Sequence, residues 1–176
     1  EAAEKVELLL QIAGIWEGNL DNKLQASAAY EEVLELDPIN ETAANALEEI
    51  LREQEDWEPL VAVFLAQAEA YEEAGDSAGQ VRMLQRAAAV LEKDAEDLDT
   101  AYAFLQHAFG IDYSNEDTAV AIERIATAAN KWDELLEEYT GMVTQIDDDN
   151  ERCELWVKIG RWYGDHLDNP EKGTEA

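Results

Sequence analysis

The side chains best suited to chemistry in this sequence are one cysteine, Cys153, and two histidines, His107 and His166. A cysteine nucleophile needs a base beside it, but His166 lies in the same predicted helix, about 20 Å further along its axis. Neither histidine has another histidine, a cysteine or a set of carboxylates at the spacing of a zinc site. One cysteine also excludes an internal disulfide. We therefore expect no nucleophilic or zinc centre, and we expect His107 to lie on a helix surface.

An acidic run at residues 147–151 resembles the start of a calcium-binding loop. Such a loop requires glycine at its sixth position and an acidic residue at its twelfth, where this sequence has Arg152 and Lys158. We expect instead a turn between helices, in which these carboxylates act as caps. Adjacent glutamates such as Glu31 and Glu32 recur along the chain, but without the companion groups of a catalytic pocket. The sequence therefore predicts a protein that is not an enzyme and uses neither a metal nor a cofactor.

The chain is strongly acidic. It has 42 acidic and 12 basic residues among 176, which gives a formal net charge of −30. The acidity is even, with 20 acidic and 5 basic residues in 1–88 and 22 acidic and 7 basic residues in 89–176. Nucleic acids and anionic membranes bind clustered lysine and arginine, so the composition argues against both partners. No run reaches the roughly 18 apolar residues of a membrane helix. The acidity serves either solubility or a basic partner.

Helix-forming residues dominate the sequence, and apolar residues recur at three-and-four spacing. Val6, Leu9, Leu10, Ala13 and Trp16 show this pattern near the N-terminus. Short turn-forming segments separate the helical runs, which favours antiparallel helix pairs, and no strand pattern competes. The predicted helices cover approximately residues 2–18, 23–36, 41–54, 57–74, 77–93, 97–110, 116–129, 131–146 and 151–166.

The sequence also repeats itself at an offset of 75 residues. The run LDPINE at residues 36–41 reappears as IDYSNE at residues 111–116. Because a unit of this length holds four helices, it divides into two helical hairpins, each close to the ~34 residues of a short helical repeat. Further matches at the same offset are Leu47 with Ile122, Glu48 with Glu123, Ile50 with Ile125, Trp57 with Trp132, Leu60 with Leu135, and Phe64 with Tyr139.

Two motifs carry a family resemblance. Trp156-x2-Ile159-Gly160-x2-Tyr163 matches the first-helix pattern of tetratricopeptide repeats, and Ala26-x3-Tyr30 followed by Pro38 matches the second-helix pattern. The chain therefore resembles this family over nearly its whole length. Weaker copies of the first-helix pattern begin at Leu9, Ala44, Leu84 and Ala119.

Three positions depart from the family pattern. Glu48 and Glu123 stand where the family has glycine, and Tyr113 stands where it has proline. These departures affect the packing of their repeats and the pitch of the superhelix. A looser solenoid of helical hairpins is the alternative architecture.

The resemblance implies an all-α fold of about nine helices, in which antiparallel helix pairs form a right-handed superhelix. We expect one solenoid over residues 1–176, as part of a longer repeat protein. Stacking would bury the apolar face of each hairpin, with Trp156, Tyr30 and Phe64 inside and with Trp57 and Trp132 as wedges between hairpins. The implied repeats are approximately 6–40, 41–78, 81–115, 116–150 and 153–176, the last of them incomplete.

In this family the first helices of the hairpins line a concave groove that binds peptides. The positions that face the groove in the family correspond here to a set that we call the first-helix row. A mildly basic row within an acidic shell would suit an acidic or carboxylate-bearing peptide. Acidic residues such as Glu49 and Glu53 map to the same face, so ion pairing within the chain is the simpler explanation. The first-helix row consists of Asn45, Arg52, Arg82, Gln85, Arg124 and Arg161.

The sequence thus predicts a non-catalytic scaffold that binds a protein or peptide in the groove of a solenoid. The alternative is a structural spacer or self-association segment, which would join other copies through exposed solenoid ends and use its acidity for solubility.

Overall fold

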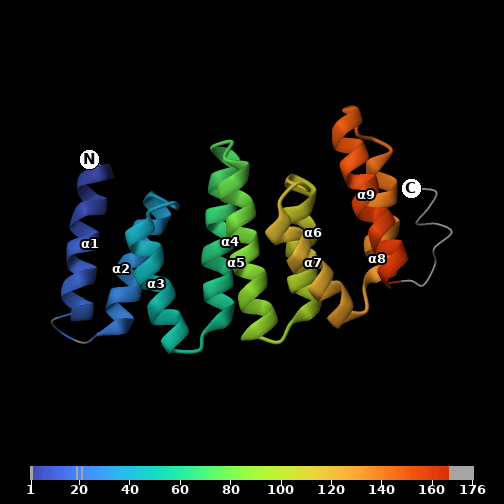
Figure 1. Cartoon of the computed structure of the whole chain (residues 1–176). Coiled ribbons are helices and arrows are strands. Elements are labelled where there is room, and N and C mark those ends of the chain that lie inside the picture. The colour runs from blue at the N-terminus through green and yellow to red at the C-terminus, as the bar shows by residue number, and fades with distance from the viewer. Residues whose placement is uncertain (1, 19, 21, 167–176) are drawn as a thin grey trace. The chain divides into compact units, whose positions relative to one another are not determined.

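The computed structural model describes residues 2–18, 20 and 22–166, with only the backbone of Asp165 and His166 (Figure 1). Within these residues there are nine helices and no strand, which confirms the predicted all-helical, solenoid-like fold. Residues 167–176, at the end of the fifth predicted repeat, and the side chain of His166 lie outside the described part. The helices are α1 (Ala2–Gly18), α2 (Lys23–Leu36), α3 (Glu41–Glu53), α4 (Trp57–Glu73), α5 (Ser77–Lys93), α6 (Leu98–Ile111), α7 (Glu116–Ala129), α8 (Trp132–Val143) and α9 (Asp149–His166).

Two asparagines that are 75 residues apart, Asn40 and Asn115, cap the N-termini of α3 and α7. The Asn40 side chain accepts a hydrogen bond from the backbone N–H of Ala43 at 3.1 Å, at the start of α3. The Asn115 side chain accepts one from Thr118 at 2.9 Å, at the start of α7. Each cap satisfies an N–H group that has no partner inside the helix. The repeated asparagine in LDPINE and IDYSNE therefore has a defined structural role.

The acidic run at residues 147–151 caps a helix, as predicted. Asp148 Oδ1 accepts hydrogen bonds from the backbone N–H groups of Asn150 at 2.9 Å and Glu151 at 3.0 Å. As a result, α9 begins at Asp149, two residues earlier than the sequence predicted. Helix α8 ends at Val143, three residues earlier than predicted, and the Thr144 hydroxyl after it donates to the carbonyl of Gly141 at 2.7 Å. Such a side-chain bond competes with continuation of the helix.

The turns between hairpin helices also repeat. Glu55 between α3 and α4 has a φ of 55°, and Asn130 between α7 and α8 has a φ of 56°. These two residues are related by the 75-residue offset. Both take the left-handed conformation, which ends a helix and reverses the chain in a short connection. The offset therefore relates backbone conformations as well as side chains.

The chain divides into two compact units, Glu1–Asp97 and Leu98–Ala176. The first unit contains α1 to α5 and the second contains α6 to α9. Within each unit, successive helices run up and down beside one another (Figure 1). The boundary falls inside the predicted repeat 81–115, and one continuous array over residues 1–176 stays a prediction.

Small and large apolar side chains fill the interior of each unit. Ala13, Ala26 and Ala87 have no exposed surface, which lets neighbouring helices approach closely, as expected. Burial of each large apolar side chain contributes about 1.5–3 kcal/mol relative to exposure. Large side chains that are almost fully buried include Leu47, Leu60 and Phe64 in the first unit, and Ile122, Leu135 and Tyr139 in the second.

Helices that alternate along the chain also lie side by side within a unit. In the first unit, Arg86 on α5 bonds to Glu48 on α3. In the second unit, Tyr139 on α8 donates its hydroxyl to the carbonyl oxygen of Gln106 on α6 at 3.1 Å. Burial raises the pKa of Tyr139 far above its usual value, so this donor stays protonated. Contacts between alternate helices are what a stack of hairpins requires.

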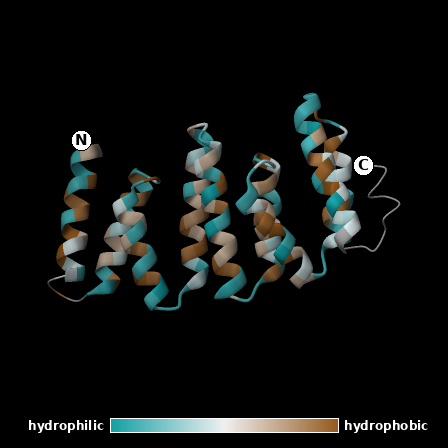
Figure 2. Cartoon of the chain, in the orientation of Figure 1, coloured by the Kyte–Doolittle hydropathy of each residue, from teal (hydrophilic) through white to brown (hydrophobic). Residues whose placement is uncertain are grey.

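Hydrophobic and hydrophilic residues alternate along the helices, as Figure 2 shows. Helix α1 nevertheless leaves an apolar stripe open, with 57% of Leu8, 36% of Ile12 and 49% of Ile15 exposed. Among the helices in the described part of the chain, none is long and apolar enough to cross a membrane.

The close approach of α4 and α5 depends on Gly79. A Cβ atom at this position would lie 2.6 Å from Tyr71 Cγ and 2.7 Å from Asp76 Oδ2, far inside normal contact distance. We predict that Gly79→Ala lowers the free energy of unfolding by about 1–3 kcal/mol, because the Tyr71 ring must move. Urea denaturation followed by circular dichroism would measure this change.

The matched control is Gly141→Ala in α8, where an added Cβ meets nothing within 4 Å. This change should raise stability by up to about 1 kcal/mol, since alanine is the better helix former. Equal stability of the Gly79→Ala and native chains would contradict the proposed close approach.

Candidate functional site

The first-helix row lies on four helices. Asn45 and Arg52 are on α3, Arg82 and Gln85 on α5, Arg124 on α7, and Arg161 on α9. Gln85 is half-buried and the other five are exposed. Since α3 and α5 lie side by side, the row members of the first unit belong to one surface. Arg124 and Arg161 lie on α7 and α9, which are neighbours in the second unit.

Arg52 is already occupied by carboxylates. Its Nε lies 3.0 Å from Glu48 and its Nη1 lies 3.4 Å from Asp94, just after α5. Glu48, with 17% of its side chain exposed, also bonds to Arg86. These three contacts join α3 to α5, in agreement with the simpler expectation of ion pairing within the chain. With 43% of its side chain exposed, Arg52 gains only about 0–1 kcal/mol from such pairing.

Two arginines of α5 lie over aromatic rings. The guanidinium carbon of Arg86 is 4.4 Å from the centre of the Phe64 ring, and that of Arg82 is 5.6 Å from the centre of the Tyr71 ring. Both rings belong to α4. A cation in this position is attracted to the negative face of the ring. Arg82 therefore has an aromatic partner within the chain while its side chain stays exposed.

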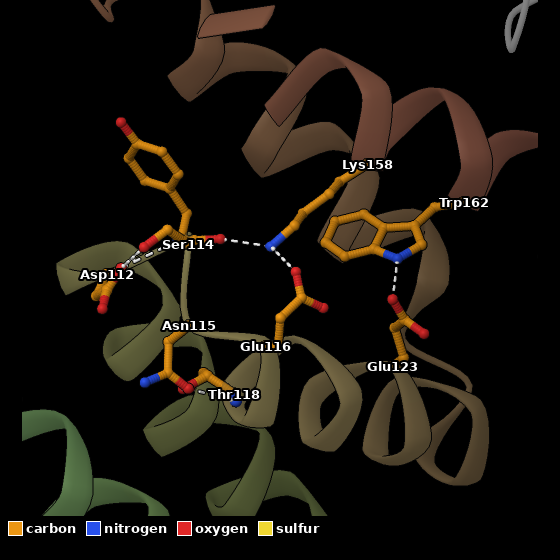
Figure 3. Close-up of polar contacts among 9 residues, drawn as sticks. Asp112, Ser114, Asn115, Glu116, Thr118, Glu123, Lys158 and Trp162 are labelled. Atoms are coloured by element: carbon orange, nitrogen blue, oxygen red, sulfur yellow. Dashed lines mark hydrogen bonds and ion pairs between the residues drawn. The ribbon is translucent and has the colours of Figure 1, made fainter. Parts of the chain in front are cut away.

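Glu123 occupies in the second unit the place of Glu48 in the first, but its partner differs. Trp162 Nε1 donates a hydrogen bond to Glu123 Oε1 at 2.6 Å (Figure 3). The Trp162 ring is only 2% exposed and packs among the rings of Phe109, Tyr139 and Trp132, with ring centres 5.8 to 6.2 Å away. Trp132 thus acts as the wedge that the sequence predicted, whereas Trp57 is half-buried.

This change of partner affects Arg161. At the 75-residue offset Arg161 is the equivalent of Arg86, and Trp162 is the equivalent of Ala87. Because Trp162 takes the glutamate in the second unit, Arg161 does not have the partner that Arg86 has. Among the described residues Arg161 forms no ion pair, and it lines a cleft.

The cleft beside Arg161 has a volume of about 390 Å³ and lies between α9 and the start of α7. Lys158 lies at its edge, where its Nζ donates to the carbonyl oxygen of Tyr113 at 2.7 Å and lies 3.6 Å from Glu116 (Figure 3). Cys153 also lines the cleft. Fixed donors and one exposed guanidinium can hold a carboxylate or a peptide carbonyl.

Cys153 on α9 and His107 on α6 lie on different helices. The side chains that line the cleft include no histidine beside Cys153, and His107 is exposed on α6, as predicted. Within residues 2–18, 20 and 22–166, no three His, Cys, Asp or Glu side chains come together as a metal site.

The buried face of α9 that the tetratricopeptide motif predicted is wrong. Trp156 was expected in the interior, but it is only half-buried, as is Tyr163. The buried residues are instead Leu155, Ile159 and Trp162. Their four-and-three spacing is itself a helical signal, and it indicates a face one position away from the one that the family motif selects.

No protein-family model matches this sequence, and a search of curated proteins finds no match.

The buried role of Trp162 can be tested against a matched residue in the same helix. We predict that Trp162→Phe lowers the free energy of unfolding by about 2 kcal/mol, because the ring loses contacts and Glu123 loses a donor. Trp156→Phe, at a half-buried position, should cost less than about 1 kcal/mol. Urea denaturation of both variants measures the difference, and a larger loss for Trp156→Phe would mean that the motif had selected the right face.

Proposed function

We propose that this chain is a non-catalytic scaffold of the tetratricopeptide-repeat type, which binds a protein segment along its first helices. The observation that carries the proposal is the direct contact between α3 and α5 through the pairs Arg86 with Glu48 and Arg52 with Asp94. Because these helices belong to successive predicted hairpins, their exposed side chains form a surface that an extended peptide can follow.

The four arginines of the row favour a partner with a carboxylate. A peptide carboxylate would have to displace Glu48 or Asp94 to reach Arg52, so Arg52 would add little affinity. Arg161 has no carboxylate to displace among the described residues, and its cleft offers further polar groups. The affinity for an acidic segment should therefore depend chiefly on Arg161.

The alternative function is a spacer or self-association segment. The open stripe of Leu8, Ile12 and Ile15 on α1 favours it, because an exposed apolar face can pair with another copy. The net charge of −30 opposes it, since two copies repel each other at low salt.

Affinity capture from a lysate tests the proposed surface. We predict that the native chain retains a partner at moderate salt, and that a triple alanine variant at Arg52, Arg124 and Arg161 loses it. A second triple alanine variant, at Lys93, Lys131 and Arg152, changes the net charge equally outside the row and should retain the partner. Within the first variant, restoring Arg161 should recover most of the binding.

Two outcomes would contradict the proposal. Equal retention by both variants would assign binding to another surface. A chain that retains nothing, but forms dimers as its concentration rises, would favour the self-association alternative.

A further inference from the structure

A second surface of the first unit lies between two of its second helices, α2 and α4, away from the first-helix row. Here a groove of about 360 Å³ is lined mainly by apolar side chains. Leu34 of α2 and Pro59, Ala62 and Val63 of α4 form its walls, and Glu31 and Glu35 lie at its edge. We call it the α2–α4 groove. Its volume is near the lower end for ligand pockets and suits one or two side chains rather than a cofactor.

The position in the second unit that is equivalent to the α2–α4 groove lies on α6 and α8, and it carries different side chains. At the 75-residue offset, Pro59, Ala62 and Val63 correspond to three acids, Glu134, Glu137 and Glu138. The equivalent of Leu34 is Phe109, which is fully buried and packs edge-on against Tyr139 with ring centres 4.8 Å apart. The same position is therefore apolar in the first unit and polar in the second. In the second unit a cleft of about 500 Å³ is lined by Gln106, Gly110 and Glu138, the equivalents of Glu31, Glu35 and Val63.

An open apolar wall is unexpected in a chain with 42 acidic residues. The second unit demonstrates that glutamates are compatible with this helix face, so the fold does not demand Ala62 and Val63. Apolar side chains that solvent reaches and that packing does not require are typical of a binding surface.

One polar group in the groove lacks a partner. Gln67 lines the groove and is only 5% exposed, and its Oε1 accepts no hydrogen bond from any described residue. A buried acceptor without a donor destabilises a protein. The equivalent residue in the second unit is Met142, which has no such requirement. A ligand with an N–H group would supply the missing donor.

We propose that the α2–α4 groove binds a basic peptide segment, which inserts a tryptophan side chain between Leu34 and Val63. The indole N–H would bond to Gln67 Oε1, and flanking lysine or arginine would face Glu31 and Glu35. Tryptophan is the side chain that combines a large apolar surface with a single N–H donor. A second copy of this chain is disfavoured as the occupant, because both copies would carry −30. The site is separate from the first-helix row, so it does not depend on the function proposed above.

Fluorescence anisotropy with the whole chain tests this site. The probe is a short labelled peptide with one tryptophan flanked by lysines, and the comparison peptides replace the tryptophan by alanine or the lysines by glutamate. The native chain should bind the probe about tenfold or more tightly than either comparison peptide, which is the usual effect of losing an anchor side chain or its charge complement.

Substitutions copied from the second unit separate groove binding from general attraction to an acidic surface. Ala62→Glu and Val63→Glu each add a negative charge, as Glu137 and Glu138 do in the second unit. Each should nevertheless lower the affinity for the probe about tenfold, because the glutamate blocks the apolar wall. Val120→Glu adds the same charge at a 61% exposed valine on α7 and should leave the affinity unchanged or slightly raised. Helix content by circular dichroism checks that the variants fold. Ala62 is exposed and Val63 is half-buried, so Ala62 is the safer of the two groove positions.

Gln67→Met, copied from Met142, tests the hydrogen bond itself. This variant should melt no lower than the native chain, because it removes an unpaired buried acceptor. It should also lose the preference for a tryptophan peptide over a phenylalanine peptide, a preference that the native chain should show.

Several results would overturn the proposal. Equal probe binding by Val63→Glu and Val120→Glu would reduce the effect to charge alone. If Gln67→Met still prefers the tryptophan peptide, the proposed hydrogen bond from the indole to Gln67 is wrong. Self-association of the native chain that Val63→Glu abolishes would make a second copy the occupant. The triple alanine variant at Arg52, Arg124 and Arg161 should bind the probe normally, which keeps this test distinct from that of the first-helix row.

Discussion

A glutamate on one first helix receives a hydrogen bond from the next first helix in both units of this chain. Glu48 of α3 accepts from Arg86 of α5, and Glu123 of α7 accepts from Trp162 of α9. Each bond adds to other polar contacts between the same hairpins, which are Arg52 with Asp94 in the first unit and Lys158 with Tyr113 and Glu116 in the second. The glutamates are partly buried, where charge-assisted bonds are stronger. These are the positions at which tetratricopeptide repeats have glycine. A bridging side chain thus stands where the family pattern allows close backbone approach.

The choice of donor determines what remains on the surface. In the first unit Arg86 reaches its glutamate across the Phe64 ring, and Arg52 shares the same carboxylate. In the second unit an indole replaces the guanidinium as donor and fills the interior, so Arg161 lines a cleft instead. The two units therefore share a backbone plan, with equal caps and turns, and differ in the side chains that they offer to partners.

Much of the fold follows from the sequence because local signals agree. Helix propensity, asparagine caps and apolar spacing located all nine helices of the described residues to within a few positions. The family motif selects the wrong inward face of α9, although the spacing of Leu155, Ile159 and Trp162 indicates the right one. The bond from Trp162 to Glu123 joins residues 39 positions apart, so no local signal predicts it. The open α2–α4 groove could not be predicted from the sequence, because Leu34 and Val63 have the same periodicity as core residues. Periodicity shows which face is apolar, but whether another helix covers that face depends on the size of side chains far along the chain.

The coupling between Glu48 and Arg86 is the most direct test of this account. A double-mutant cycle with Glu48→Ala, Arg86→Ala and the double variant, measured by urea denaturation of the whole chain, isolates the interaction between the two side chains. We predict a favourable coupling of about 1 kcal/mol, which salt weakens only partly because Glu48 is partly buried. A coupling of zero would contradict the claim that these glutamates hold successive first helices together as one surface.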